Sequence, residues 1–132
     1  TLLEARLDDP DAAERWAAEL GRLTPPPDGA ALASHLTRAA RAQVAWSRSD
    51  PATALAELEA GQSEAWFQLT VASPFYSQAC ERFLRADLLV ALGRTEEAAG
   101  WYQSMAERSP YEIIYRAPAK ARIRAMRRSV RG

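Results

Sequence analysis

The chain has 132 residues, contains one cysteine and one histidine, and carries equal numbers of acidic and basic residues. With Cys80 as its only cysteine it cannot form an internal disulfide, and with His35 as its only histidine it offers no cluster of the usual transition-metal ligands. It contains no apolar run of the roughly 20 residues that a membrane-spanning helix needs, and its first residues are charged where a signal peptide would be apolar. We therefore expect a cytoplasmic protein with no membrane span, no metal and no cofactor.

Charge is unevenly distributed along the chain although the total is zero. Residues 1–28 carry a net charge of −4, and residues 111–132 carry +6. The acidic end holds Asp8, Asp9, Asp11, Glu14 and Glu19. The basic end holds Arg122, Arg124, Arg127, Arg128 and Arg131. One end of the molecule is therefore predicted to be acidic and the other strongly basic.

Helix starts and stops can be read in chain order. Asp9-Pro10 and Asp50-Pro51 each predict a helix start, because aspartate caps the first backbone N–H groups and proline at the first helical position has no N–H that needs a partner. The segment "TPPPDG", residues 24–29, predicts a break between two helical regions. Ser109-Pro110 predicts the end of a later helix, because proline disfavours helix at the residue before it.

The helical pattern repeats at offsets of 44, 41 and 39 residues. In each unit a helix with an Arg-Ala pair is followed, seven residues after that alanine, by a turn residue, and glycine there suits the left-handed conformation that ends a helix. The turn positions are Ser49, Gly93 and Gly132. Four residues into each following helix lies a small residue that lets two helices approach closely. These positions are Ala13, Ala54 and Ala98.

This pattern resembles the tetratricopeptide repeat (TPR). The residues that carry the resemblance are Ala86, Gly93, Ala98, Tyr102 and Pro110, all in the third unit. The resemblance implies an all-α protein, a right-handed α-solenoid of about three TPR-like helical hairpins with partial repeats at both ends. The predicted single domain covers 1–132, with units at about 1–23, 30–61, 74–110 and 111–132 and an irregular insert at about 61–75.

The repeat register also places the chain in a larger context. It begins midway through a helix at Thr1 and ends at a turn at Gly132, so both ends resemble cuts from a longer solenoid, in a fragment of a larger protein or of what was once one. Similar segments occur in the repeat tails of bacterial multidomain signalling proteins, which the third unit resembles. The resemblance therefore implies an interaction module of a larger bacterial protein.

In TPR proteins certain first-helix positions line a concave groove that binds a partner segment. Carried onto this sequence, the groove residues include Gln43, Trp46, Phe83, Asp87 and Val90. Such a surface suits an extended or helical peptide with apolar anchors, and the alternative is that other parts of the chain fill the groove. We expect Trp16 and Trp101, which share one phase of the second helix, to pack in the core.

The basic end allows several interpretations. It is a solvated final helix, a contact for an anionic partner, or one half of a head-to-tail contact with the acidic end that would assemble copies of the chain into a homo-oligomer. Nucleic acid is disfavoured because no aromatic stacking platform accompanies the charge. No nucleophile and base are arranged for catalysis, so we predict no enzymatic activity. A segment that regulates a catalytic domain elsewhere is a further possibility.

Overall fold

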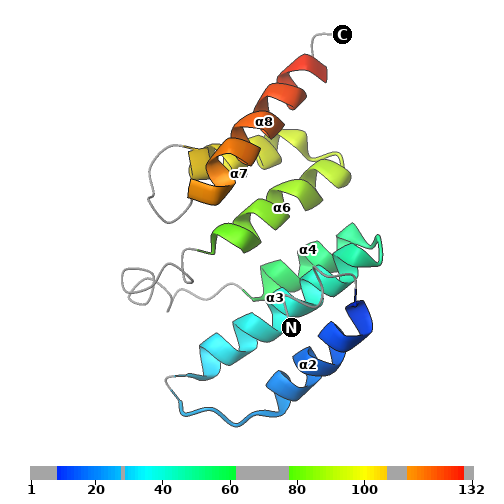
Figure 1. Ribbon diagram of the computed structural model, residues 1–132, viewed down its shortest axis with the longest axis vertical. Helices are drawn as coiled ribbons and strands as arrows, with labels where there is room; N and C mark the ends of the chain where they lie inside the picture. Colours follow the sequence, from blue (N-terminus) through cyan, green and yellow to red (C-terminus); the bar gives the residue numbers. More distant parts are fainter. Residues whose placement is uncertain (1–8, 28, 62–77, 107–112, 130–132) are drawn as a thin grey trace. The chain divides into compact units, whose positions relative to one another are not determined.

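In the computed structural model, residues 9–27, 29–61, 78–106 and 113–129 are described, and all regular structure within them is α-helical (Figure 1). This confirms the prediction of an all-α chain. The chain divides into two compact units, Thr1–Ala65 and Trp66–Gly132. The two units are considered separately below. Residues 62–75 of the predicted insert, and Asp8, Pro110, Arg131 and Gly132, lie outside the described residues.

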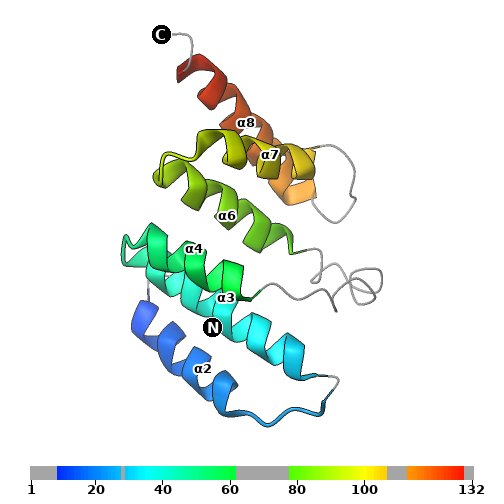
Figure 2. The ribbon, with the colours of Figure 1, turned by 180° about the vertical axis from the view of Figure 1, so that it is seen from behind.

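The first unit consists of α2 (Pro10–Arg22), α3 (Ala30–Ser47) and α4 (Pro51–Ala60), and α3 packs against both of the others (Figure 2). Both predicted helix starts are confirmed. The Asp9 carboxylate accepts a hydrogen bond from the backbone N–H of Ala12 at 2.9 Å, and Asp50 accepts one from Thr53 at 3.0 Å. Hydrogen bonds from the side chain and backbone of Thr53 hold the pKa of Asp50 below its ordinary value.

Small residues form much of the core of the first unit. Ala13 and Ala17 of α2 are fully buried, as are Ala40 and Ala42 of α3 and Ala54 of α4. Side chains of this size let the helix backbones approach closely, as the sequence pattern predicted for Ala13 and Ala54. The three helices therefore pack through alanine-rich faces together with a few larger apolar side chains, Val44, Leu55 and Leu58.

The second unit consists of α6 (Ala79–Ala91), α7 (Thr95–Ala106) and α8 (Ile113–Ser129). Helix α7 packs against α6 and α8, and α8 also contacts α6. Larger side chains fill this core than the first. The largest buried ones are Leu88 and Leu89 of α6 and Tyr102 and Met105 of α7. Ala98, the predicted small residue of α7, is also fully buried.

The two helical hairpins α3–α4 and α6–α7 share one turn geometry. Ser49 has a φ of 60° and Gly93 a φ of 77°, so both lie in the left-handed region that the sequence predicted. In each turn the next backbone N–H closes the helix, Asp50 donating to the Ala45 carbonyl at 2.9 Å and Arg94 to the Leu89 carbonyl at 2.8 Å. The turn positions of the repeat pattern are therefore confirmed at both hairpins.

Of the two turn residues, Ser49 has the less favourable backbone conformational energy in the folded chain, because a residue with a Cβ is strained at positive φ. We expect Ser49→Gly to raise the free energy of unfolding by about 0.5–1 kcal/mol. Gly93→Ala is the reverse substitution at the equivalent position, and it should lower the free energy of unfolding by about 1 kcal/mol. A Cβ at Gly93 would meet no atom within 4 Å, so this loss would come from backbone strain alone. Urea unfolding measures both, and a loss of stability in Ser49→Gly would contradict the strain argument.

The prediction that Trp16 packs in the core is wrong, because its side chain is 54% exposed. Fully buried Ala13 and Ala17 bring α2 close to α3 and leave no room for an indole in that contact. Trp101, its counterpart in α7, is half-buried. The guanidinium of Arg85 stacks over the Trp101 ring at 4.9 Å, a contact between α6 and α7 that the sequence did not indicate.

Candidate functional site

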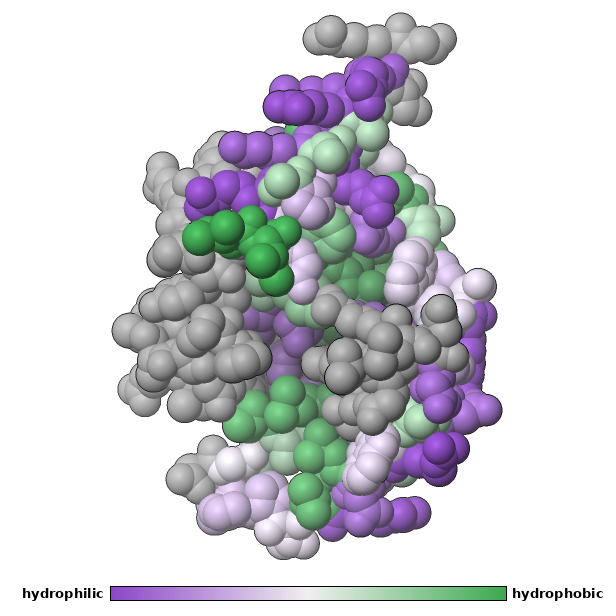
Figure 3. Space-filling view, viewed as in Figure 1, coloured by the Kyte–Doolittle hydropathy of each residue, from purple (hydrophilic) through white to green (hydrophobic). Residues whose placement is uncertain are grey.

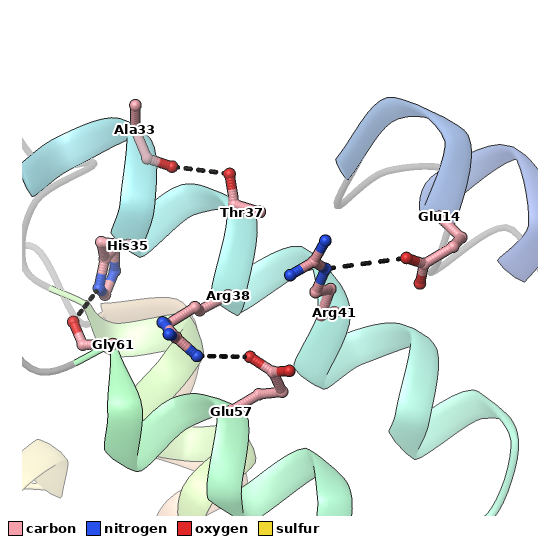
Figure 4. Close-up of polar contacts among 8 residues, drawn as sticks. All are labelled: Glu14, Ala33, His35, Thr37, Arg38, Arg41, Glu57 and Gly61. Atoms are coloured by element: carbon pink, nitrogen blue, oxygen red, sulfur yellow. Dashed lines mark hydrogen bonds and ion pairs between the residues drawn. The ribbon is translucent and has the colours of Figure 1, made fainter. Parts of the chain in front are cut away.

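Helix α3 carries several polar side chains that contact the neighbouring helices (Figure 4). The guanidinium of Arg38 donates to Glu57 of α4 at 3.1 Å, and Arg41 pairs with Glu14 of α2 at 3.7 Å. Nδ1 of His35 lies 3.2 Å from the carbonyl oxygen of Gly61, at the end of α4. The arginine-bearing face of α3 therefore ties α2 and α4 to the central helix.

The hollows of the first unit lie on this same side. A hollow of about 360 Å³ between α2, α3 and α4 is lined by Glu14, Arg41, Arg48 and Glu57 among others. Its arginines already have carboxylate partners, since Arg41 contacts Glu14 and Arg48 contacts Asp11 at 2.8 Å. A charged ligand entering it would have to break an existing ion pair. The candidate interaction surface of the first unit is therefore formed by the exposed apolar side chains of α3.

The groove positions that the repeat register gives for the first unit are Leu36, Ala39, Gln43 and Trp46. With about 100° between successive residues they lie on one side of α3, roughly 140–160° from Arg41, and Ala39 among them is buried. Leu36 and Trp46 are each 36% exposed, and Gln43 between them is half-buried. They extend over about 15 Å of the helix axis. We call these three residues the α3 strip.

The predicted groove residues of α6 make contacts inside the second unit. The ring of Phe83 packs edge-on against Tyr102 of α7 and also lies 5.3 Å from the ring of Tyr115 of α8. Asp87 accepts a hydrogen bond from the Tyr102 hydroxyl at 2.5 Å. It also pairs with Arg122 of α8 at 3.0 Å. Val90 is 38% exposed. Of the three, Val90 is thus the one with a large exposed fraction.

The contact between Asp87 and Tyr102 changes the ionisation of the tyrosine. Burial, with the hydrogen bond to the Asp87 carboxylate as a further cause, raises the pKa of Tyr102 well above its ordinary value. The phenol therefore stays protonated and donates to the carboxylate over the whole physiological pH range. Asp87 joins α6 to both α7 and α8, which is a structural role that its sequence position did not indicate.

The acids of the N-terminal end are engaged within the first unit. Asp9 caps α2, Asp11 pairs with Arg48, and Glu14 pairs with Arg41. Glu19 pairs with Arg22 at 3.3 Å on the surface of α2. Each of these four described acids has a partner in its own unit. The acidic end that the sequence predicted is therefore largely neutralised locally.

The bases of α8 differ among themselves. Arg122 contacts Asp87, as described above. Lys120, Arg124, Arg127 and Arg128 are exposed, and among the ion pairs formed by described residues none involves them. Figure 3 shows hydrophilic side chains gathered over α8 and hydrophobic side chains near its beginning. Among the predicted basic residues that the structure describes, Arg124, Arg127 and Arg128 are thus the ones available to a partner.

Two further classes of site, a metal site and a membrane span, are absent from the described ranges. No group of three or more histidine, cysteine, aspartate or glutamate side chains is placed there to hold a metal ion. No helix in those ranges combines the length and apolar character that crossing a membrane requires. The features that stand out are the α3 strip and the cationic surface of α8.

Comparison with protein-family models, curated proteins and solved structures finds no match to this chain. The interpretation of the two surfaces therefore depends on their own geometry and charge.

Proposed function

We propose that this chain is a protein–protein interaction module, and that the α3 strip binds an extended or helical segment of another protein. The observation that carries the proposal is that Leu36 and Trp46, two large apolar side chains of α3, are each 36% exposed although alanines beside them on the same helix are buried. Tryptophan is the residue most enriched among those that dominate binding energy at protein interfaces.

The geometry of the strip favours a peptide over a small molecule. Its two apolar side chains are separated by about 15 Å along a convex helix surface, which suits anchors spaced along a chain rather than one compact ligand. We further propose that the hairpins belong to a TPR-like, right-handed solenoid, as the sequence resemblance implies.

The test uses short peptides selected from a displayed random library on the complete chain. We expect Trp46→Ala to weaken binding of the selected peptides by about tenfold or more, because a large apolar anchor is lost. Its melting temperature should change little, since the indole is partly exposed. Isothermal titration measures the affinity, and thermal unfolding followed by circular dichroism measures the stability.

Trp16→Ala is the matched control, because Trp16 is an exposed tryptophan on a different helix. It should bind the selected peptides as the unchanged chain does. Equal weakening in both variants would show that the peptides recognise tryptophan side chains generally. A large fall in melting temperature in Trp46→Ala would show instead that the indole is part of the core, and the proposal would fail.

Head-to-tail self-assembly remains the competing proposal. It would join the basic surface of α8 to the acids of α2 in another copy, and those acids would first have to leave their present arginine partners. Light scattering over a concentration series distinguishes the two functions. A mass that grows with concentration and falls on addition of salt would support assembly, whereas a constant mass would remove it.

A further inference from the structure

The exposed side of α8 presents one continuous surface that changes character along the helix. Ile113, Ala117, Lys120, Arg124 and Arg127 recur at alternating spacings of four and three residues, which places them on one line of the helix. Arg128 lies beside this line. Ile113 is 64% exposed and its neighbour Ile114 is 75% exposed. The surface is thus apolar over the first turn and cationic over the remaining turns, and extends for about 22 Å.

The inner side of the same helix is used for packing. Ala119 is fully buried, Ile123 and Met126 are half-buried, and the ring of Tyr115 packs against Phe83. The apolar stripe of α8 therefore faces the rest of the second unit. The exposed isoleucines lie outside this stripe, so the packing of α8 does not explain them.

The helix dipole explains the position of only some of the basic residues of α8. Arg127 and Arg128 lie in the last turn, where cations interact favourably with the helix dipole. That effect falls off within one turn, so it does not account for Lys120 and Arg124. Helix α8 contains no acidic residue, and none of these four bases has an ion-pair partner among the described residues. The surface therefore lacks a complement within this part of the chain.

We propose that this face of α8 binds an acidic polypeptide segment, one that places an aliphatic side chain against Ile113 and Ile114 and carboxylates against Lys120, Arg124, Arg127 and Arg128. Charge complementarity fixes the sign of the partner, and the exposed isoleucines fix its apolar end. This site is on a different unit from the α3 strip, so it is independent of the function proposed above.

A polypeptide fits this surface better than the other anionic partners. Proteins bind single-stranded nucleic acid through aromatic stacking as well as charge, and Tyr115, the aromatic residue of α8, packs against Phe83. A helix that lies on a membrane buries an apolar face along its whole length. Here the long apolar stripe faces inward, and the exposed large aliphatic side chains, Ile113 and Ile114, lie at one end of the helix.

The probe is a synthetic helical peptide with glutamates at alternating spacings of three and four and two leucines at one end. Fluorescence anisotropy with the complete chain measures its affinity. We expect Arg124→Gln, Arg127→Gln and Arg128→Gln together to weaken binding by about tenfold or more, and Ile113→Ser with Ile114→Ser to weaken it several-fold. Raising the salt concentration from about 0.05 M to about 0.5 M should lower the peptide affinity of the unchanged chain toward that of the triple variant.

The matched control places the same change in net charge on other exposed positions, with Ala52→Glu and Ala56→Glu on α4 and Gln103→Glu on α7. It should bind the acidic peptide as the unchanged chain does. Equal weakening in this control and in the triple arginine variant would overturn the proposal, because net charge alone would then explain binding. So would tighter binding to phosphatidylserine vesicles or to a single-stranded oligonucleotide than to the peptide. Circular dichroism confirms that each variant folds.

Discussion

Leu88→Ala should lower the free energy of unfolding of the second unit by about 3 kcal/mol. Leu88 is fully buried on α6, and α6 packs against α7, where Tyr102 and Met105 are equally buried. Removing its isobutyl group loses the transfer free energy of the side chain and leaves a cavity that rigid neighbours fill only in part. A loss of that size is a large fraction of the stability of a small domain.

Urea unfolding followed by circular dichroism measures this loss, and hydrogen exchange of the α6 and α7 amides assigns it to the second unit. Leu92→Ala is the matched control, because Leu92 ends the same helix and is 38% exposed. Leu92→Ala should lower the free energy of unfolding by about 1 kcal/mol or less. If the two variants lost equal stability, the packing of α6 against α7 would not be the main source of stability in this unit.

Local features of the fold were predictable from the sequence. The Asp-Pro helix starts depend on a hydrogen bond between residues three apart, and the turns at Ser49 and Gly93 depend on the backbone angles of one residue. Neither requires knowledge of a neighbouring helix. The buried alanines at positions 13, 54 and 98 were also predicted, because their repeat register places them at the same point of each hairpin.

Features that depend on packing between helices were not predictable in this way. Asp87 and Phe83 occupy register positions that were predicted to face a groove, yet their contacts are with Tyr102, Tyr115 and Arg122 of the two following helices. A repeat register gives the direction of a side chain from its own helix, but not how closely the next helices approach. The exposure of Trp16 was missed for the same reason.

In the candidate surfaces, too, some features are predictable from the sequence and others depend on how the helices pack. The choice of Leu36 and Trp46 on α3 came from the TPR resemblance, and their role in binding stays a prediction. The sequence also located the bases of α8, but not which of them have partners. The pairing of Arg122 with Asp87, and of Asp11 and Glu14 with arginines of α3, requires the folded chain. Only the structure therefore separates the engaged charges from the available ones.

Asp87→Ala should lower the free energy of unfolding of the second unit by about 2 kcal/mol. The substitution leaves the hydroxyl of the fully buried Tyr102 without its acceptor and removes the carboxylate that pairs with Arg122. A buried donor without a partner loses its hydration and gains nothing in return, which costs more than the net contribution of the bond itself. Urea unfolding measures the change, with Tyr102→Phe and the double variant completing a mutant cycle.

The cycle isolates the contact between the two side chains. Tyr102→Phe removes the donor, so the further substitution of Asp87 should cost about 1 kcal/mol less than it does in the unchanged chain. Glu97→Ala serves as the comparison on the surface, because Glu97 also pairs with an arginine, Arg94, but on an exposed part of α7, and its loss should be smaller. If Asp87→Ala instead left stability unchanged and weakened peptide binding, Asp87 would belong to a partner-binding groove, as the sequence first indicated.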